Sequence, residues 1–342
     1  MWDRRLDKPG PESIIPGMNA HKTALYSVLR WRVNPLIALV VVGAATACTG
    51  SEADPSESAA LDDAGRTMRA AFASDRAGDL DLYLLTPGAD DVDALVVAPG
   101  SQYGPSWRPD GAALVYDSEV DDNTEVWRVA VDGTDPVQLT DRPGYDGGAS
   151  YSPDGAQIVF VSDRDALVDG HSGRDLWLMN ADGSDPIRLS TNEHYEGAPR
   201  FSPSGDRIAF CRQIRLEDGT QDGEIFVMDA DGSNERRVTH TPGFDCLPDW
   251  SPDGTLLAFH RCVDGRCWIY ALAPDGEAEA VRVSPDSLPG QWPRWAPNGG
   301  WIAYTTTKDE QTDIWAVRPD GSQAHALTTH PARDEVLAWQ PR

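Results

Sequence analysis

Short runs in which apolar and polar residues alternate fill most of the chain after residue 67, and nearly the same run returns at regular intervals. An alternation with a period of two is typical of β-strands, and Pro-Asp-Gly favours a tight turn. We therefore predict a hairpin at each copy. The copies read WRPDGAALVY (107–116), YSPDGAQIVF (151–160), FSPSGDRIAF (201–210), WSPDGTLLAF (250–259) and WAPNGGWIAY (295–304).

A second phrase follows each of four hairpins, and its aromatic and branched residues predict a third strand. It reads EVW (125–127), DLW (175–177), EIF (224–226) and DIW (313–315). A second turn comes next, as in NADGSD (180–185), and a short apolar segment such as 137–140 predicts a fourth strand. The unit is thus four strands, and no helical periodicity is evident after Cys48.

The repeat has a period of about 45 residues, which is typical of propeller blades. Its prolines stand at positions 109, 153, 203, 252, 297 and 341. Residues 68–99 match the later strands of a blade without a first strand, and residues 335–339 match a first strand alone. We predict that residues 67–342 form an all-β, six-bladed propeller of four-stranded blades. The C-terminal strand would join the N-terminal blade and close the ring.

The chain is strongly acidic, with a formal net charge of −26 over 342 residues. Phosphate binding requires a basic footprint, so nucleic acid is excluded as a partner. Such a surface suits metal ions or a basic protein, or serves solubility alone.

The first residues predict export. Arg30 and Arg32 precede the charge-free stretch LIALVVVGAATA (36–47), and Cys48 follows directly. Twelve residues are too few to span a bilayer, but they fit the apolar part of a signal peptide. We predict a signal peptide over 1–47, with translation starting either at Met1 or at Met18. Ala45-Thr46-Ala47-Cys48 is similar to a bacterial lipobox, so Cys48 is the predicted lipidation site; cleavage by ordinary signal peptidase is the alternative.

The cysteine count agrees with a lipid anchor. Five cysteines leave one unpaired in an exported chain, and lipidation of Cys48 at the head of a polar tether (48–66) would leave four. Cys262 and Cys267 flank a predicted turn, which favours one disulfide, and Cys211 and Cys246 would form the other between successive repeats. Four buried thiols are the alternative.

The segments that lead from one blade into the next contain carboxylates and imidazoles. In a closed propeller these segments meet on one face around the central channel, so we expect this face to bind the partner. Carboxylates suit calcium, and imidazoles suit zinc or manganese; no cofactor is predicted beyond a possible divalent metal of this kind. Each residue taken singly can also be explained as a solvated loop residue. The candidates are Asp146, His194, Glu196, His240, Asp245, His330 and Asp334.

The Ser-Pro-Asp-Gly turn, the Phe-x-Ser-Asp-Arg phrase (72–76 and 160–164) and the Asp-Ile-Trp strand together resemble the TolB-type, WD-like propeller repeat. The resemblance covers residues 67–342 and implies a propeller of the bacterial cell envelope. In this family TolB docks a peptidoglycan-associated lipoprotein, and related oligogalacturonate lyases hold a metal with histidines on the same face. TolB carries a further domain before its propeller, whereas here residues 48–65 alone separate the signal from the blades.

Two functions follow from these observations. The first is a non-catalytic envelope lipoprotein, monomeric and attached to the membrane by its lipid alone, which faces the periplasm or exterior and docks a protein or peptide. The alternative is a metal-dependent lyase or hydrolase with its site at the channel mouth. No Gly-x-Ser-x-Gly nucleophile elbow or other catalytic motif is present in the sequence, which favours the scaffold.

Overall fold

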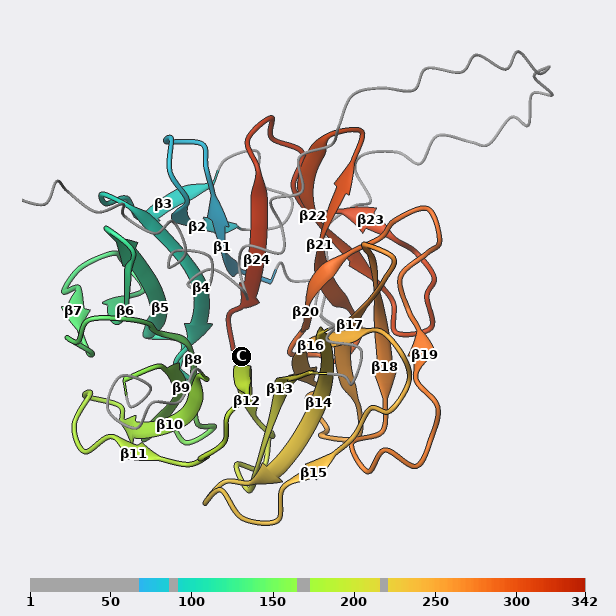
Figure 1. Ribbon diagram of the computed structural model, residues 1–342. Helices are drawn as coiled ribbons and strands as arrows, with labels where there is room; N and C mark the ends of the chain where they lie inside the picture. Colours follow the sequence, from blue (N-terminus) through green and yellow to red (C-terminus); the bar gives the residue numbers. More distant parts are fainter. Residues whose placement is uncertain (1–67, 86–91, 165–172, 216–220, 342) are drawn as a thin grey trace, which may run out of the picture. The chain divides into compact units, whose positions relative to one another are not determined.

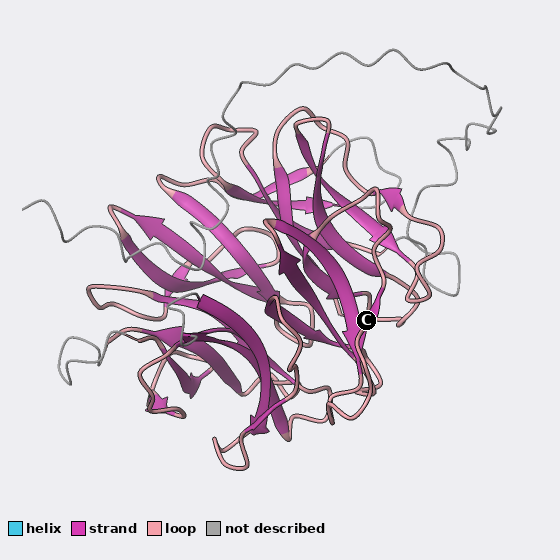
Figure 2. Cartoon of the chain, turned by 45° about the vertical axis from the view of Figure 1, so that its right-hand side comes forward, coloured by secondary structure: helices cyan, strands magenta, loops and turns pink. Residues whose placement is uncertain are grey.

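The chain folds into a ring of six four-stranded antiparallel sheets (Figures 1 and 2). The structure, a computed structural model, describes residues 68–85, 92–164, 173–215 and 221–341. All regular secondary structure in these ranges is β-strand, which confirms the predicted six-bladed propeller. Cys48, the proposed start at Met18, the signal peptide (1–47) and the tether (48–66) lie outside the described residues. Within the described ranges no helix is long and apolar enough to cross a membrane.

The blades share one strand order. The first strands are β24 (Asp334–Trp339), β4 (Ser101–Trp107), β8 (Asp146–Tyr151), β12 (Tyr195–Phe201), β16 (Phe244–Trp250) and β20 (Gln291–Trp295). The second strands are β1 (Ala70–Ser74), β5 (Ala113–Val120), β9 (Gln157–Ser162), β13 (Arg207–Arg215), β17 (Leu257–Val263) and β21 (Ile302–Lys308). The third strands are β2 (Asp81–Leu85), β6 (Asn123–Ala130), β10 (Asp175–Asn180), β14 (Gln221–Asp229), β18 (Arg266–Leu272) and β22 (Gln311–Val317). The fourth strands are β3 (Asp93–Val96), β7 (Val137–Gln138), β11 (Ile187–Arg188), β15 (Arg236–Arg237), β19 (Val281–Arg282) and β23 (His325–Ala326).

The first strands surround the centre of the ring and the short fourth strands form its outer edge (Figure 1). We number the blades from the one that contains β1. Blade 1 takes its first strand from the C-terminal segment, because β24 pairs antiparallel with β1 and places Trp339 opposite Ala70. The predicted closure by the C-terminal strand is therefore confirmed, and it removes two open sheet edges.

The recurring turn joins the first and second strands. In blade 3 the amide of Gly155 donates to the carbonyl of Ser152 at 2.8 Å, and the Asp154 carboxylate accepts from the amide of Ala156 at 3.0 Å. Gly155 has a φ of +69°, a conformation that glycine adopts without steric cost. These bonds explain why Ser, Pro, Asp and Gly return together.

The hydrophobic core lies between neighbouring blades. One cluster, for example, brings Phe72 and Leu337 of blade 1 against Ile314 of blade 6. Three of the aromatic residues before the turn prolines add a hydrogen bond to the preceding blade: the indole Nε1 of Trp107 donates to the carbonyl of Ala338 at 2.9 Å, and Trp250 and Trp339 donate in the same way. The recurring aromatic residues are therefore inter-blade contacts.

Two disulfides lie in blades 4 and 5. Cys211 on β13 is joined to Cys246 on β16, so this bond crosses from one blade to the next. Cys262 is joined to Cys267, its direct partner across the β17–β18 hairpin. These are the pairs that the sequence favours over buried thiols.

The inter-blade disulfide should stabilise the fold more than the hairpin disulfide. The sequence separations are 35 and 5 residues, and the loop-entropy model gives about 4 and about 2 kcal/mol respectively. Urea unfolding of Cys211→Ala/Cys246→Ala and of Cys262→Ala/Cys267→Ala measures both, each variant controlling for the other. A larger loss in the hairpin variant would show that the disulfides do not act through chain entropy.

Candidate functional site

The five recurring turns and the C-terminal Pro341 lie at one end of the first strands and form a rim around the channel. Four of the five turn glycines lie against the turn proline of the preceding blade, and the fifth, Gly111, lies against Gln340. A Cβ added to Gly155 would lie 3.3 Å from Pro109 Cδ, and one added to Gly205 would lie 3.5 Å from Pro153 Cδ. Gly155 and Gly205 have positive φ angles of +69° and +79°, a conformation that favours glycine, and the turns pack against one another around the opening.

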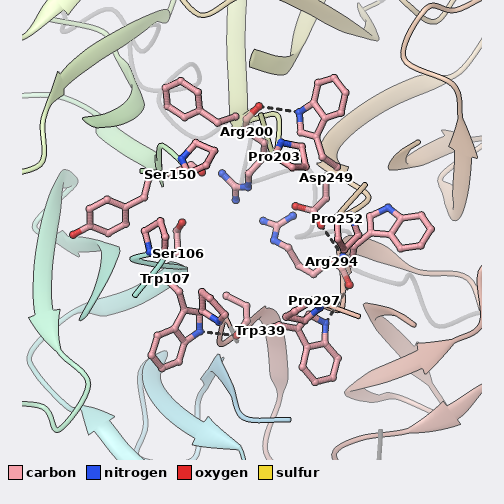
Figure 3. Close-up of a pocket in the computed structure, with 18 of the residues that line it drawn as sticks. Ser106, Trp107, Ser150, Arg200, Pro203, Asp249, Pro252, Arg294, Pro297 and Trp339 are labelled. Atoms are coloured by element: carbon pink, nitrogen blue, oxygen red, sulfur yellow. Dashed lines mark hydrogen bonds between the residues drawn. The ribbon is translucent and has the colours of Figure 1, made fainter. Parts of the chain in front are cut away.

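A pocket of about 470 Å³ opens inside this rim (Figure 3). This volume lies within the range of small-ligand sites. The aromatic rings behind its walls are largely buried, at 6–9% exposure. The same three positions of each blade line the pocket. They are the turn proline, the aromatic residue two positions before it, and the residue directly before that aromatic residue. We call the last of these positions the innermost tier. The innermost tier is Ser106, Ser150, Arg200, Asp249, Arg294 and Ala338.

A β-bulge in each first strand sets the direction of this tier. The register with the second strand shifts at the same place in all six blades, for example between Cys246 and Asp249. The residue two positions before each innermost-tier residue has a positive φ, and Leu247 (+57°), Trp292 (+60°) and Val336 (+53°) adopt it although they are not glycines. A positive φ costs conformational energy in a residue other than glycine. Bulges commonly re-aim side chains next to binding sites.

Three charged side chains meet in the pocket, and among the described residues they are the only charged ones in its lining: Arg200, Asp249 and Arg294. Both guanidinium groups face the centre of the opening and the Asp249 carboxylate lies beside them (Figure 3). Arg200 Nη1 donates to the carbonyl of Pro199 at 2.8 Å, and Arg294 Nη1 donates to that of Pro293 at 2.9 Å. The site carries a net charge of about +1, counting each guanidinium and carboxylate as fully charged.

The Asp249 carboxylate is fixed from the neighbouring blade. Its Oδ2 accepts a hydrogen bond from the amide of Trp295 at 2.7 Å. Burial raises the pKa of Asp249, and the charges of Arg294 and Arg200 together with this amide oppose the increase. Asp249 on blade 5 is thus tied to blade 6 by this bond, and its negative charge lies beside the two guanidinium groups.

The four carboxylates among the sequence candidates lie at the opposite end of the first strands. Asp146 and Asp334 begin β8 and β24, and Glu196 and Asp245 stand one residue inside β12 and β16. All are buried, with exposures of 2% for Asp146 and 0% for the other three. They therefore do not meet in the pocket at the turn end.

Each of these carboxylates binds an arginine from the second strand of its own blade or from the residues just after that strand. The shortest N–O distances are 2.9 Å for Arg164–Asp146, 2.5 Å for Arg212–Glu196, 2.6 Å for Arg261–Asp245 and 2.9 Å for Arg76–Asp334. Each guanidinium also lies over two aromatic rings, as Arg261 does at 5.5 Å from Phe259 and 5.0 Å from Tyr270. We call this unit the arginine clasp.

The arginine clasp affects the pKa values of three of these carboxylates. Burial raises the pKa of Asp146, Glu196 and Asp245, and the paired guanidinium opposes the increase in each case. A buried carboxylate already held by an arginine is not available to a partner at the surface. In this geometry the four residues stabilise their blades, and a role in binding stays a prediction.

The amino-acid sequence of the propeller assigns the chain to a protein family. A family model described as the TolB β-propeller domain matches residues 64–216 and 192–342, which together exceed half of the chain. The chain belongs to the TolB β-propeller family. None of the curated proteins compared with the sequence matches it significantly.

Solved structures share the fold of this TolB-family propeller. TolB from Acinetobacter baumannii has a TM-score of 0.68 and 18% identity, over 80% of this chain and 67% of that one. A putative TolB from Agrobacterium tumefaciens has a TM-score of 0.61 and 20% identity, over 80% and 99%. An oligogalacturonate lyase in complex with manganese has a TM-score of 0.54 and 19% identity, over 80% and 77%. At these identities the likeness shows the fold.

The candidate histidines of the TolB-family propeller are exposed and lie in different connecting segments. His194, His240 and His330 all have exposed side chains, and His330 Nδ1 accepts a hydrogen bond from the amide of Ala332 at 3.0 Å. Within the described ranges, no three His, Cys, Asp or Glu side chains come together in a way that could hold a metal. A divalent metal therefore stays a prediction without a preformed centre among these residues.

Sequence reasoning missed Arg200, Asp249 and Arg294. A signal was present: each stands three residues before a turn proline or its equivalent at 203, 252 and 297, next to the apolar residues of the first strand. In a TolB-family propeller that alternation places them on the channel side. The bulge, which the alternation cannot show, decides how far each side chain turns into the opening.

Proposed function

We propose that the protein is a non-catalytic scaffold of the bacterial cell envelope, anchored by lipid at Cys48, whose propeller docks a protein or peptide at the channel mouth inside the turn rim, the end opposite to the connecting segments. The observation that carries this proposal is the pocket inside the turn rim. It is walled by proline and aromatic residues and contains two guanidinium groups that point into the opening. The TolB family assignment supports an envelope role for the chain.

The lining favours binding over catalysis. Acyl or glycosyl transfer needs a nucleophile beside a base or a pair of carboxyl groups. Over residues 68–341, as far as they are described, the pocket lining contains serines but no His, Cys, Lys or Glu, and Asp249 is its single carboxylate. Asp249 is engaged with the Trp295 amide.

A metal-dependent lyase is the second candidate, because an oligogalacturonate lyase with manganese shares the fold. The strongest acid–base group for this function is Glu224, since burial raises its pKa to about 7. Glu224 is fully buried, however, and is bound by Thr239 and Arg237. Strongly shifted groups also occur in structural ion-pair networks, so Glu224 favours the scaffold over the lyase.

Photocrosslinking tests the docking surface in the cells that naturally express the protein. A photoreactive phenylalanine at Ser150, in the innermost tier, should crosslink a discrete partner. The same group at Val281, which is 68% exposed on the outer strand β19, is the matched control and should not. Identical products from both positions, or none from Ser150, would rule out docking at the channel mouth. Fractionation of the same cells tests the anchor, because Cys48→Ser should leave the membrane fraction.

A further inference from the structure

The channel mouth has the opposite charge from the rest of the molecule. The chain has a net charge of −26, whereas the three charged lining residues, Arg200, Asp249 and Arg294, sum to about +1 at neutral pH. Pocket walls of low dielectric constant strengthen and focus the field of charges inside them. The pocket therefore attracts anions on a molecule that otherwise repels them.

The two guanidinium groups are held in place before any ligand arrives. Arg200 Nη1 contacts the carbonyls of Pro199 and Gly148 at 2.8 and 3.4 Å, and Arg294 Nη1 contacts the carbonyl of Pro293 at 2.9 Å. The backbone of both arginines is fixed as well. The indole of Trp250 donates to the carbonyl of Arg200 at 3.1 Å, and that of Trp339 donates to the carbonyl of Arg294 at 3.2 Å.

This rigidity matters for affinity and for the choice of ligand. A side chain that is already ordered loses less entropy on binding. A planar guanidinium with five N–H donors matches a carboxylate, which it can bind through two parallel hydrogen bonds. Two guanidinium groups around one opening should therefore bind a carboxylate more tightly than they bind a neutral group.

The remaining walls favour a peptide over a sugar. The aromatic rings behind the wall are 6–9% exposed, so they present little of the ring face on which a sugar would stack. Seven prolines line the opening, for example Pro105, Pro153 and Pro252, and they give apolar surface without hydrogen-bond donors. Such a wall suits the apolar groups next to a carboxylate in a peptide.

We propose that the channel mouth binds one carboxylate of a peptide segment through Arg200 and Arg294. This inference rests on the proposed docking function and names the chemistry of its partner. The carboxylate belongs either to an Asp or Glu side chain or to a peptide C-terminus, since both present the same group.

Peptide binding to the full chain tests the proposal. The probes are a hexapeptide amide with a central glutamate, the same peptide with glutamine, and the glutamine peptide with a free C-terminal carboxylate; digalacturonate is the sugar probe. Dissociation constants come from ligand-observed NMR. The glutamate peptide, the free-carboxylate peptide or both should bind about tenfold more tightly than the neutral peptide, and added salt should reduce the difference. Which of the two binds identifies the source of the carboxylate.

Three variants assign the effect to residues. Arg200→Gln/Arg294→Gln keeps donors of similar reach but removes both charges, so the preference for the carboxylate should disappear. Asp249→Asn keeps an acceptor for the Trp295 amide and removes the negative charge, so anionic peptides should bind more tightly. Arg282→Gln removes one positive charge from the outer strand β19, outside the pocket lining, so it is the matched control and should bind like the unmodified chain. Circular dichroism and thermal unfolding confirm that each variant is folded.

The outcomes distinguish the inferred carboxylate site from the proposed docking function. Equal binding of neutral and anionic peptides would overturn the carboxylate inference and leave the docking function in place. Binding of digalacturonate without any peptide would overturn both and favour the lyase. Absence of binding by every probe would overturn the carboxylate site, while crosslinking from Ser150 would still decide the docking function. A preference that survives in the double arginine variant would also overturn the assignment to Arg200 and Arg294.

Discussion

A chain shortened to end at residue 333 should lose cooperative folding. The deletion removes β24 and leaves β1, whose five residues are all buried, without its inner partner. It also removes Leu337 and Trp339 from the cluster shared by blades 1 and 6. Removing one buried tryptophan side chain alone costs about 3–5 kcal/mol, against a typical domain stability of about 5–15 kcal/mol. Near-UV circular dichroism and urea unfolding would show the loss.

A chain that lacks only residues 341–342 is the matched control. It keeps β24 and the hydrogen bond from the Gln340 amide to the carbonyl of Arg69 at 2.9 Å, so it should unfold like the full chain. A synthetic peptide of residues 334–342 should restore near-UV signal to the shortened chain, because it supplies the missing strand. Cooperative unfolding of the shortened chain at an unchanged midpoint would show that the ring does not depend on this closure.

The fold could be predicted because the strand pattern, the turn motif and the partial blades at the two ends of the sequence agree with one another. The alternation of period two gives the strands, and the Ser-Pro-Asp-Gly turn specifies where the first hairpin reverses. The unmatched halves at residues 68–99 and 335–339 predict the closure, which the pairing of β24 with β1 confirms. Local signals such as Gly155 and Asp154 act within a few residues, so they can be read without coordinates.

The candidate site could not be predicted as well, because burial and direction depend on neighbouring blades. Asp245 and Glu196 appear in the sequence as acidic loop residues, but each is covered and bound by an arginine about sixteen residues later. The arginine near the end of the second strand was visible in the sequence at 76 and 164, within the Phe-x-Ser-Asp-Arg phrase. Its pairing with an acid at the start of the first strand depends on the register of the sheet.

Replacing one clasp arginine should strongly destabilise the propeller. In Arg261→Met the Asp245 carboxylate, which is 0% exposed, loses hydrogen bonds to both oxygens at 2.7 and 2.6 Å. Leaving a buried charge without its partner costs about 3–5 kcal/mol, while methionine still covers the rings of Phe259 and Tyr270. Urea unfolding at pH 7 measures the loss. Arg108→Met, which removes an exposed pair with Asp110, should change stability by less than about 1 kcal/mol.

The pH dependence of this variant distinguishes a buried charge from lost packing. Burial already raises the pKa of Asp245, and Arg261 opposes that increase, so its removal raises the pKa further. A carboxyl group whose pKa is higher in the folded state stabilises the fold below its unfolded pKa of about 3.9 and loses this contribution as the pH rises. The deficit of Arg261→Met should therefore be small near pH 3.5 and grow towards pH 7.

The double variant Arg261→Met/Asp245→Leu completes the argument. Replacing a buried ion pair by apolar residues of similar volume is often neutral, so it should recover most of the stability lost by the single variant and show no such growth with pH. A deficit that is equal at both pH values, or that persists in the double variant, would assign the clasp to packing of the arginine against its rings. The clasp would then have no electrostatic role in stability, and the binding role of the predicted carboxylates would stay a prediction.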